Sequence, residues 1–401
     1  MKNWKTKSLA DLCQNITDGK HGDCKPHIGS GFYFLSAKDI VDGNLNYDRA
    51  REIIEEDFIE THRRTRLEPG DVLITNSGTI GRMAIVKATE KTSRTTFQKS
   101  VAILKPRKDI VAPFFLYYSL LSNRKGIINA AGGTTQQNLL LKDIRDFEVS
   151  IPESITEQDR IIDILRTLDK KIEVNLEMIK TLEQIAQATF KHWFIDFQFP
   201  GLDDELINEL PKDWKQMPID EIAEFLNGLA MQKFPSENET DYLPVIKIRE
   251  LRQGVTDSSD KATVNISPQF IVDNGDILFS WSGSLEVVIW CNGKGALNQH
   301  LFKVTSKKFP KWFYYFWTKH YLPNFRAIAA DKATTMGHIQ RKHLTQSLVN
   351  IPPDEVINRA DQFLNALLEK IIEVNLQNQT LAQIRDTLLP KLMSGQIPVL
   401  E

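Results

Sequence analysis

Two long stretches of the chain space their apolar residues three and four positions apart. The first stretch begins near Thr156, has no Gly or Pro before Pro200, and carries Ile161, Leu165, Leu168, Ile172, Leu176, Ile179, Leu182 and Ile185. The second ends at Pro390 and carries Phe363, Leu367, Leu368, Ile371, Ile372, Leu376, Leu381, Ile384 and Leu388. Such spacing over about five heptads predicts two amphipathic or coiled-coil helices, each roughly 57 Å long. Thr156 followed by Asp159 predicts a capping box at the first helix start.

The rest of the chain alternates short β-branched and aromatic runs with Gly, Pro, Asn and Asp, which predicts strand-rich domains with many turns. Gly70-Asp-Val-Leu-Ile74 followed by Asn76-Ser-Gly-Thr79 predicts a buried strand that ends in a loop of small residues. Gly275-Asp-Ile-Leu-Phe279 followed by Trp281-Ser-Gly-Ser284 predicts the same. Small residues let a ligand approach the backbone closely in such loops.

These elements occur twice at a constant offset. Thr134-Thr135, Ile151-Pro152 and Ile172-Glu-Val-Asn-Leu176 recur 200 positions later as Thr334-Thr335, Ile351-Pro352 and Ile372-Glu-Val-Asn-Leu376. A period this long excludes a solenoid or propeller. We therefore expect a pseudo-two-fold α+β molecule with two similar sites, composed of strand-rich domains at residues 1–152 and 201–352 and helical spacer regions at residues 153–200 and 353–401.

Charge is distributed unevenly over these segments, although the net charge of the 401 residues is only -2. Residues 1–150 hold 23 Lys and Arg against 18 Asp and Glu, whereas residues 151–200 hold 6 against 9 and residues 351–401 hold 4 against 7. Positive charge in the domains and negative charge in the helices fits a protein that contacts phosphates through the domains. Taken alone, a cluster of basic residues is more often a solvated face than a phosphate-binding site.

Several classes of chemistry find no support in the sequence. There is no G-x-x-x-x-G-K-[ST] phosphate loop and no nucleophile elbow, so we expect no catalysis by this chain itself. Three widely spaced cysteines exclude a disulfide framework, and the polar loop containing His21, Cys24 and His27 is a weak candidate for a metal site. No apolar run approaches the length of a membrane span, and the N-terminus lacks a signal-peptide core, so we expect a cytoplasmic protein.

Short motifs occur along the whole chain: I-P-x7-R at 151–160, with a shorter version at 351–359, L-D-K-K-I-E-V-N at 168–175, L-L-P-K-L-M-S-G at 388–395, G-D-V-L-I-T at 70–75 with S-G-T-I-G at 77–81, and N-Q-H at 298–300. Through these motifs the whole chain resembles the specificity subunit of type I restriction-modification systems.

The resemblance implies two target recognition domains, each reading one half of a split, asymmetric double-stranded DNA sequence, separated by two long antiparallel helices that set the spacer. It also implies a prokaryotic protein, with two modification subunits that methylate adenine N6 and motor-nuclease restriction subunits that cut DNA. S-adenosylmethionine, ATP and Mg are expected in those partners, with no cofactor or metal in this chain.

Side chains that read base edges are typically Arg, Lys, Asn and Gln, whereas Ser and Thr usually contact phosphates. On this basis, the DNA-binding candidates in the first domain are Lys20, His21, Asn76, Thr79, Arg82, Gln98, Lys99, Thr134, Thr135, Gln136 and Gln137. In the second domain they are Trp281, Ser282, Ser284, Asn298, Gln299, His300, Thr334, Thr335, His338 and Gln340. The sequence pairs Gly81 and Arg82 with Glu286 and Val287, which puts an arginine contact in the second domain in doubt.

The residues of the two helices suggest two further hypotheses. If they are antiparallel, Asn175 and Asn375 lie near the midpoint of an apolar seam and could set its register; alternatively, both asparagines face water. Glu173, Glu177 and Phe194 are candidates for docking the modification subunits, although Phe194 could instead be buried against the first domain.

Two other functions are also consistent with the sequence. The chain could serve a type II system whose methylase and nuclease lie on one partner polypeptide. It could also be a two-headed scaffold for protein partners, although the Gln-, Asn-, Arg- and Lys-rich loops argue against that function.

Overall fold

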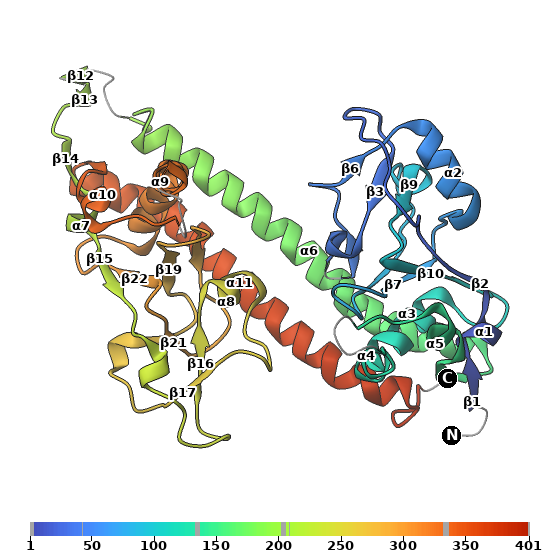
Figure 1. The fold of residues 1–401 in the computed structure, drawn as a ribbon. Helices are drawn as coiled ribbons and strands as arrows, with labels where there is room; N and C mark the ends of the chain where they lie inside the picture. Colours follow the sequence, from blue (N-terminus) through green and yellow to red (C-terminus); the bar gives the residue numbers. More distant parts are fainter. Residues whose placement is uncertain are drawn as a thin grey trace. The chain divides into compact units, whose positions relative to one another are not determined.

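The computed structural model describes residues 4–41, 43–132, 137–201, 206–207, 209–331 and 337–399. The chain divides into two compact units (Figure 1). Unit 1 comprises residues 1–170 and 382–401, and unit 2 comprises residues 171–381. Each unit therefore combines one strand-rich domain with parts of both long helices.

Unit 1 contains mostly short elements before its long helix. Its strands are β1 (Trp4–Ser8), β2 (Cys13–Asp18), β3 (Tyr33–Leu35), β4 (Ile40–Val41), β5 (Asn44–Leu45), β6 (Arg51–Glu52), β7 (Val72–Thr75), β8 (Met83–Ile85), β9 (Thr95–Phe97), β10 (Val101–Pro106) and β11 (Glu148–Pro152). Its short helices are α1 (Leu9–Leu12), α2 (Glu55–Thr65), α3 (Pro113–Ser122), α4 (Arg124–Asn129) and α5 (Leu141–Asp146). The long helix α6 (Ile155–Phe194) starts here and continues into unit 2.

Unit 2 follows the same plan. Its strands are β12 (Leu206–Ile207), β13 (Leu210–Pro211), β14 (Lys215–Pro218), β15 (Glu224–Asn227), β16 (Leu243–Ile246), β17 (Lys261–Ala262), β18 (Ile271–Val272), β19 (Ile277–Ser280), β20 (Val287–Ile289), β21 (Gly295–Leu297), β22 (Leu301–Thr305) and β23 (Leu348–Ile351). Its helices are α7 (Ile219–Ile222), α8 (Ile248–Gln253), α9 (Lys311–Asp331), α10 (Arg341–Thr345) and α11 (Asp354–Met393), whose end belongs to unit 1.

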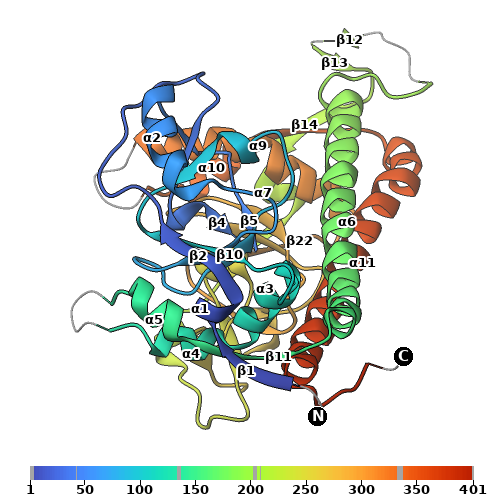
Figure 2. The same cartoon turned by 90° about the vertical axis from the view of Figure 1, so that its right-hand side faces the viewer.

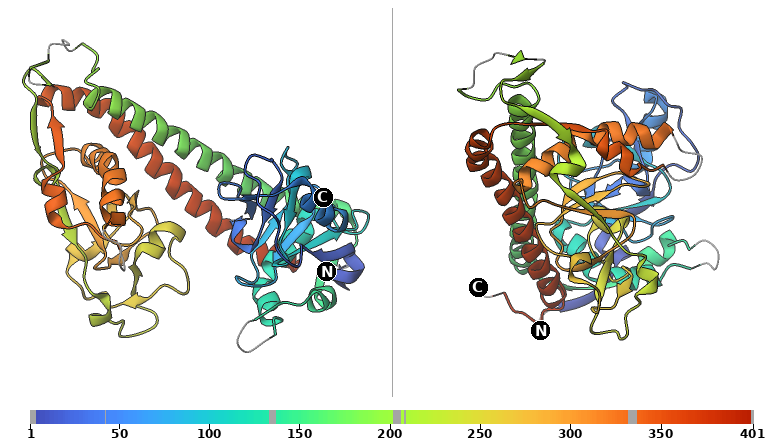
Figure 3. Two further views of the ribbon diagram at one scale, coloured as in Figure 1. Left: turned by 45° about the horizontal axis from the view of Figure 1, so that its top comes forward. Right: turned by 90° about the vertical axis from the view of Figure 1, so that its left-hand side faces the viewer.

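The sheets show that the two units share one topology. Unit 1 has a four-stranded antiparallel sheet in the order β2-β10-β7-β8, and unit 2 has its counterpart in the order β15-β22-β19-β20. In both, the last strand of the domain pairs with a strand near its beginning, β11 with β1 and β23 with β14 (Figures 2 and 3). The predicted α+β class and the duplication of the strand-rich domain are confirmed.

Both central sheets are covered on both faces, which explains their nearly continuous apolar sequences. Along β10, Ala102 and Leu104 enter one core while Val101 and Ile103 enter another, because side chains alternate between the faces of a sheet. In β19, Phe279 and Leu278 likewise enter different cores. A second sheet extends each domain: the three-stranded β6-β3-β9 in unit 1 and the four-stranded β17-β16-β21-β18 in unit 2.

Within each unit, the segments of α6 and α11 pack side by side and antiparallel (Figure 3). In unit 1, Ile161 and Leu165 near the start of α6 share a core with Leu389 and Leu392 near the end of α11. In unit 2, the rings of Trp193, near the end of α6, and Phe363, near the start of α11, lie 5.8 Å apart. The expected antiparallel pair of long helices is therefore confirmed.

Two details of the helix prediction were wrong. Ser154, not Thr156, caps α6, because its hydroxyl accepts from the Glu157 amide at 3.3 Å. Helix α11 passes Pro390 and ends at Met393. A proline inside a helix costs about 3 kcal/mol, but the extra turn buries Leu392 and Met393 in unit 1.

The apolar stripe of α6 also deviates from its predicted positions. Leu176 is 56% exposed and Ile185 is 43% exposed, whereas Asn175 and Ala186 are fully buried. A straight α-helix drifts relative to an exact heptad repeat. Residues chosen by strict three-and-four spacing therefore turn away from the buried face after a few turns. The small Ala186 side chain lies in the same core as α9.

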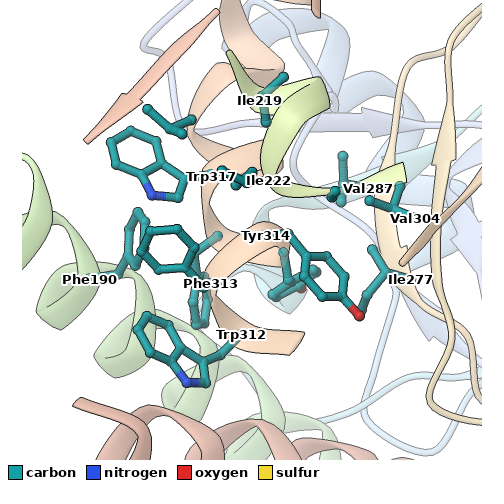
Figure 4. Packing of buried hydrophobic residues seen from close by; sticks show 14 of the residues in the cluster. Phe190, Ile219, Ile222, Ile277, Val287, Val304, Trp312, Phe313, Tyr314 and Trp317 are labelled. Atoms are coloured by element: carbon teal, nitrogen blue, oxygen red, sulfur yellow. The ribbon is translucent and has the colours of Figure 1, made fainter. Parts of the chain in front are cut away.

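Aromatic side chains fill the core of unit 2 where α6 meets α9 (Figure 4). The ring of Phe190 lies 5.3 Å from Trp317 and 6.4 Å from Trp312, and the ring of Phe194 lies 5.5 Å from Trp312. Phe194 is fully buried and also packs 6.0 Å from Trp214 of the second domain. The docking hypothesis for Phe194 is therefore wrong, as is its suggested burial against the first domain, because this ring belongs to the core of unit 2.

In the part of the chain that the structure describes, no helix is both long enough and apolar enough to cross a membrane.

Candidate nucleic-acid interface

Four segments of unit 1 meet at one end of the β2-β10-β7-β8 sheet, and we call them the first loop cluster. They are Gly19–His21 after β2, Asn76–Arg82 between β7 and β8, Gln98–Ser100 between β9 and β10, and Gln137–Leu139. Main-chain hydrogen bonds join them: Lys20 N donates to Phe97 O at 2.7 Å, Asn76 N to Ser100 O at 3.0 Å, and Leu139 N to Asn76 O at 2.9 Å. Residues from four distant parts of the sequence thus form one surface.

The equivalent segments of unit 2 form the second loop cluster, which consists of Gly228–Leu229, Trp281–Glu286, Asn298–His300 and Gly337–Gln340. The same bonds recur: Leu229 N donates to Leu297 O at 3.0 Å, Trp281 N to His300 O at 3.4 Å, and Ile339 N to Trp281 O at 3.0 Å. Both units therefore gather their candidate residues in the same way, apart from those outside the described residues, which are Thr134, Thr135, Gln136, Thr334 and Thr335.

A glycine at the start of each cluster allows this close approach. A Cβ atom on Gly19 would lie 1.9 Å from Phe97 O, and one on Gly228 would lie 2.2 Å from Asn298 O. Real Cβ atoms do not approach a main-chain oxygen so closely. Any other residue at these two positions would push the first segment of the cluster away from the sheet end.

Lys20 is engaged within the protein. Its ammonium lies 3.0 Å from Asp57 Oδ1 and 2.9 Å from Glu60 Oε2, both on α2, and the hydrogen bond to Glu60 raises the Lys20 pKa above its usual value. A hydrogen bond from the Lys25 amide lowers the pKa of Asp57, so this carboxylate is ionised at neutral pH. A DNA phosphate would have to compete with these two carboxylates for Lys20.

The other candidates of the first cluster differ in accessibility. Asn76 is 8% exposed, and its Oδ1 atom has no hydrogen-bond partner. Nε2 of His21 lies 2.9 Å from Asp18 Oδ2. Arg82 is half-buried, and its guanidinium reaches Ile40 O at 3.5 Å. The candidates whose side chains are exposed are His21, Thr79, Gln98, Lys99 and Gln137.

Candidates of the second cluster are more deeply buried. Ser282 and Asn298 are 4% and 2% exposed. Ser282 Oγ lies 3.0 Å from His300 Nδ1, and Asn298 holds its own turn, because its Oδ1 accepts from the His300 amide at 3.3 Å and its Nδ2 donates to Gln299 Oε1 at 2.8 Å. Gln299 is half-buried, and Ser284 and Gln340 are exposed. Asn298 therefore shapes the loop and has few groups left for DNA.

A hollow of about 380 Å³ opens in the second cluster. It is lined by Asn227, Trp281, Phe302, His338, Ile339, Gln340 and Arg341. The sequence did not predict Asn227 or Arg341 as site residues, because neither lies in a motif. Each contributes to the hollow through its position beside Trp281 or Phe302. Arg341 lies over the Phe302 ring at 5.6 Å, and Asn227 Oδ1 accepts from Trp281 Nε1 at 3.0 Å.

The hydrogen bonds also correct the pairing of the two clusters around Arg82. Thr75 N donates to Arg82 O at 2.8 Å, and Ser280 N donates to Glu286 O at 2.9 Å. Arg82 therefore corresponds to Glu286, not to Val287, and the second loop is one residue shorter. Glu286 is paired with two arginines, Arg252 at 3.0 Å and Arg326 at 3.1 Å.

The polar residues predicted on the helix seam behave differently from each other. Asn175 is fully buried and donates from Nδ2 to Gln377 Oε1 and to Asn378 Oδ1, both at 2.8 Å. Asn375 donates to the carbonyl of Ile371 in its own helix, at 2.8 Å. Only Asn175 bonds across the seam, and its role in setting the register stays a prediction. Glu173 and Glu177, the remaining docking candidates, are exposed on α6.

Neither the cysteines nor the other potential metal ligands of the described residues gather into a group of three. Cys13, Cys24 and Cys291 are buried free thiols, and burial raises their pKa values, to about 12 for Cys13 and about 11 for Cys291. Within the described ranges, His, Cys, Asp and Glu side chains form no group of three or more that could hold a metal ion.

Comparison with known proteins identifies the family. The family model described as the type I restriction modification DNA specificity domain matches the chain twice, over residues 1–184 and 211–385. The chain belongs to this family, so the resemblance inferred from its motifs is confirmed. The two matches coincide with the two halves of the structural repeat.

Individual relatives span nearly the whole chain. The type I restriction enzyme MjaIX specificity subunit of Methanocaldococcus jannaschii is 25% identical over 420 residues, covering 100% of this chain and 95% of the relative. The HindI specificity subunit of Haemophilus influenzae is 22% identical over 469 residues, covering 99% and 100%. The crystal structure of a type I restriction-modification S subunit from M. genitalium shares the fold, with a TM-score of 0.55 at 16% identity, covering 100% of this chain and 97% of that one.

Proposed function

We propose that this chain is the non-catalytic DNA specificity subunit of a type I restriction-modification complex. It recognises a bipartite, asymmetric DNA sequence, and each domain reads one half-site through its loop cluster. The long helices set the spacer between the half-sites. Partner subunits then carry out adenine-N6 methylation and restriction at the sites that this chain selects.

One observation supports this proposal above the others. The two halves of the chain match the same DNA specificity model and bring equivalent loops together on the same sheet, yet the side chains of those loops differ. A repeated scaffold with different loop side chains suits the reading of two different half-sites. Asn, Gln, Arg and Lys side chains in the loops are the residue types that contact base edges.

The expected partners follow from the same function. The complex would hold double-stranded DNA, two modification subunits and motor-nuclease restriction subunits, with S-adenosylmethionine, ATP and Mg bound by those partners. Adenine methylation inside a duplex requires the target base to be flipped out, and the modification subunits would do this beside each domain. The names of the relatives are those of type I subunits, which favours a type I system over a type II system with a fused partner.

Docking of the modification subunits is assigned to the exposed acidic face of α6. The test is the double substitution Glu173→Lys and Glu177→Lys, with co-purification of a modification subunit as the readout. The matched control is Glu237→Lys with Glu239→Lys, which reverses two exposed charges on a loop of the second domain. Unchanged co-purification in both variants would remove the docking assignment.

The function itself is tested by methylome sequencing of the host, with and without an in-frame deletion of this chain. We expect the deletion to abolish one split adenine-methylated motif, which would define both half-sites and the spacer. If the methylome is unchanged, expression of the chain with a cognate modification subunit must create a split motif, and failure there rejects the proposal.

A further inference from the structure

The hollow in the second loop cluster has a rigid aromatic wall. Trp281 Nε1 donates to Asn227 Oδ1 at 3.0 Å, which holds the indole in one orientation. The indole lies 5.9 Å from the Phe302 ring and 5.9 Å from the His300 ring, with interplanar angles of 32° and 39°. Trp281 is half-buried, so part of the ring lines the open hollow.

The first loop cluster has no such wall at the corresponding positions. Main-chain bonds pair Trp281 with Asn76 in the repeat, and strand register pairs Phe302 with Ala102, because Phe279 faces Phe302 as Ile74 faces Ala102. The two large rings of the second cluster thus correspond to an amide and a methyl group. At these equivalent positions the second domain therefore has an aromatic wall, and the first domain does not.

The size and lining of the hollow define what it can hold. At about 380 Å³ it exceeds the roughly 30 Å³ of one water molecule by about an order of magnitude, so it is far larger than a single methyl group requires. Aromatic rings stack on nucleobases of any sequence. Among the lining residues, Gln340 and Arg341 are of the types that hydrogen-bond base edges.

We infer that this hollow receives one unpaired nucleobase, turned out of the half-site that the second domain reads and stacked against Trp281. The inference rests on the proposed function and deepens it, because it assigns an unstacked base to the second domain only. A paired base could present only its edge to the cluster, and an edge would leave most of the hollow unfilled. Unstacking has a free-energy cost that falls when the base is already unpaired, which makes the inference measurable.

The experiment uses the full chain assembled with its modification subunits and duplexes carrying the motif found by methylome sequencing. At each base pair in turn, one base is replaced by an abasic site, and the affinity is compared with that of the intact duplex. We expect one position of the second half-site at which an abasic site opposite the extruded base tightens binding about tenfold. No position of the first half-site should behave in this way.

Variants of Trp281 connect that signal to the hollow. Trp281→Ala should weaken binding to the intact site about 5-fold to 150-fold, the equivalent of about 1–3 kcal/mol of base stacking, and should weaken binding of the favourable abasic duplex as well. Trp281→Phe keeps an aromatic face and should retain most of the affinity. If Trp281→Ala fails to fold, the abasic series with the unaltered protein still decides.

Three results would overturn the inference. The first is the absence of a tighter-binding abasic position in the second half-site. The second is a loss of affinity upon uracil-for-thymine replacement that equals the Trp281→Ala loss, which would assign the hollow to a thymine methyl group. The third is unchanged DNA affinity of Trp281→Ala together with weaker retention of the modification subunit, which would assign it to a protein side chain. A complex that does not prefer its motif over scrambled DNA would instead contradict the proposed function.

Discussion

The two recognition domains share a backbone framework and differ in the side chains that the framework presents. In the first loop cluster, Asn76 stands where the second cluster has Trp281, and Arg82 stands where it has Glu286. The same hydrogen bonds hold both clusters, so the loops can change their side chains without changing the sheet. The framework is the constant part of the molecule, and readout is the variable part.

The two units also differ in how the domain attaches to the long helices. In unit 1, aliphatic side chains of both helices, such as Ile161 and Leu392, enter the core of the domain, and polar groups add to the attachment: Tyr118 donates to Asp169 at 2.5 Å, Arg385 contacts the same carboxylate at 2.8 Å, and the buried Gln158 bonds to the loop before α3. In unit 2, aromatic rings around Phe194 dominate.

Phe194→Ala should reduce the free energy of unfolding of unit 2 by about 3–5 kcal/mol, because it leaves a cavity among fully buried rings. Hydrogen exchange should show faster opening of β14, β19 and β22, with the strands of unit 1 unaffected. The control is Ile185→Ala on the same helix, whose side chain is 43% exposed. Equal effects of the two substitutions would contradict the aromatic attachment of unit 2.

Gln158→Leu should destabilise unit 1 by about 2–3 kcal/mol, because buried polar groups lose their partners. Its side chain accepts from Ala112 N at 2.8 Å and donates to Pro152 O at 2.9 Å and Ile110 O at 3.1 Å. Asn358→Leu, at an exposed position of α11, is the matched control and should change stability by less than about 0.5 kcal/mol. Urea unfolding of both variants measures the difference.

Gly19→Ala and Gly228→Ala should each disturb one loop cluster and spare the other, at about 1–3 kcal/mol of binding or stability, because the new methyl group overlaps a main-chain oxygen. Binding to duplexes with one half-site scrambled reports each domain separately. Gly22→Ala is a useful control, since nothing lies within 4 Å of its added Cβ and only its backbone angle, φ +118°, is strained. Loss of both half-sites from either cluster variant would argue against independent clusters.

Lys99→Ala should weaken DNA binding uniformly across sequences and reduce the slope of log affinity against log salt by about 1, as expected for one lost phosphate contact. Lys99 is exposed in the first cluster, and the neutral Gln299 occupies the equivalent position in the second cluster. Gln299→Ala should therefore leave the salt slope unchanged. A change in sequence preference without a change in slope would make Lys99 a base reader.

Much of the architecture could be predicted from the sequence. Local patterns are strong where a periodicity extends over many residues, as in the helices around Ile161 and Leu368, or where a landmark recurs 200 residues later, as Ile151-Pro152 does. Predictions that depended on a single side chain did less well. Thr156 does not cap its helix, and Phe194 is a core residue instead of a docking residue.

The sequence by itself determined the duplication, the α+β class and the family, because these depend on patterns that run along the chain. Only the tertiary structure decided that Arg82 corresponds to Glu286, that Lys20 is held by Asp57 and Glu60, and that Asn227 and Arg341 complete a hollow around Trp281. The Lys20 ion pairs join residues 37 and 40 positions apart, and the hollow brings together Asn227 and Arg341, which are 114 positions apart. Long-range contacts of this kind are set by how strands pair and loops meet, and no local pattern of apolar and polar residues records them.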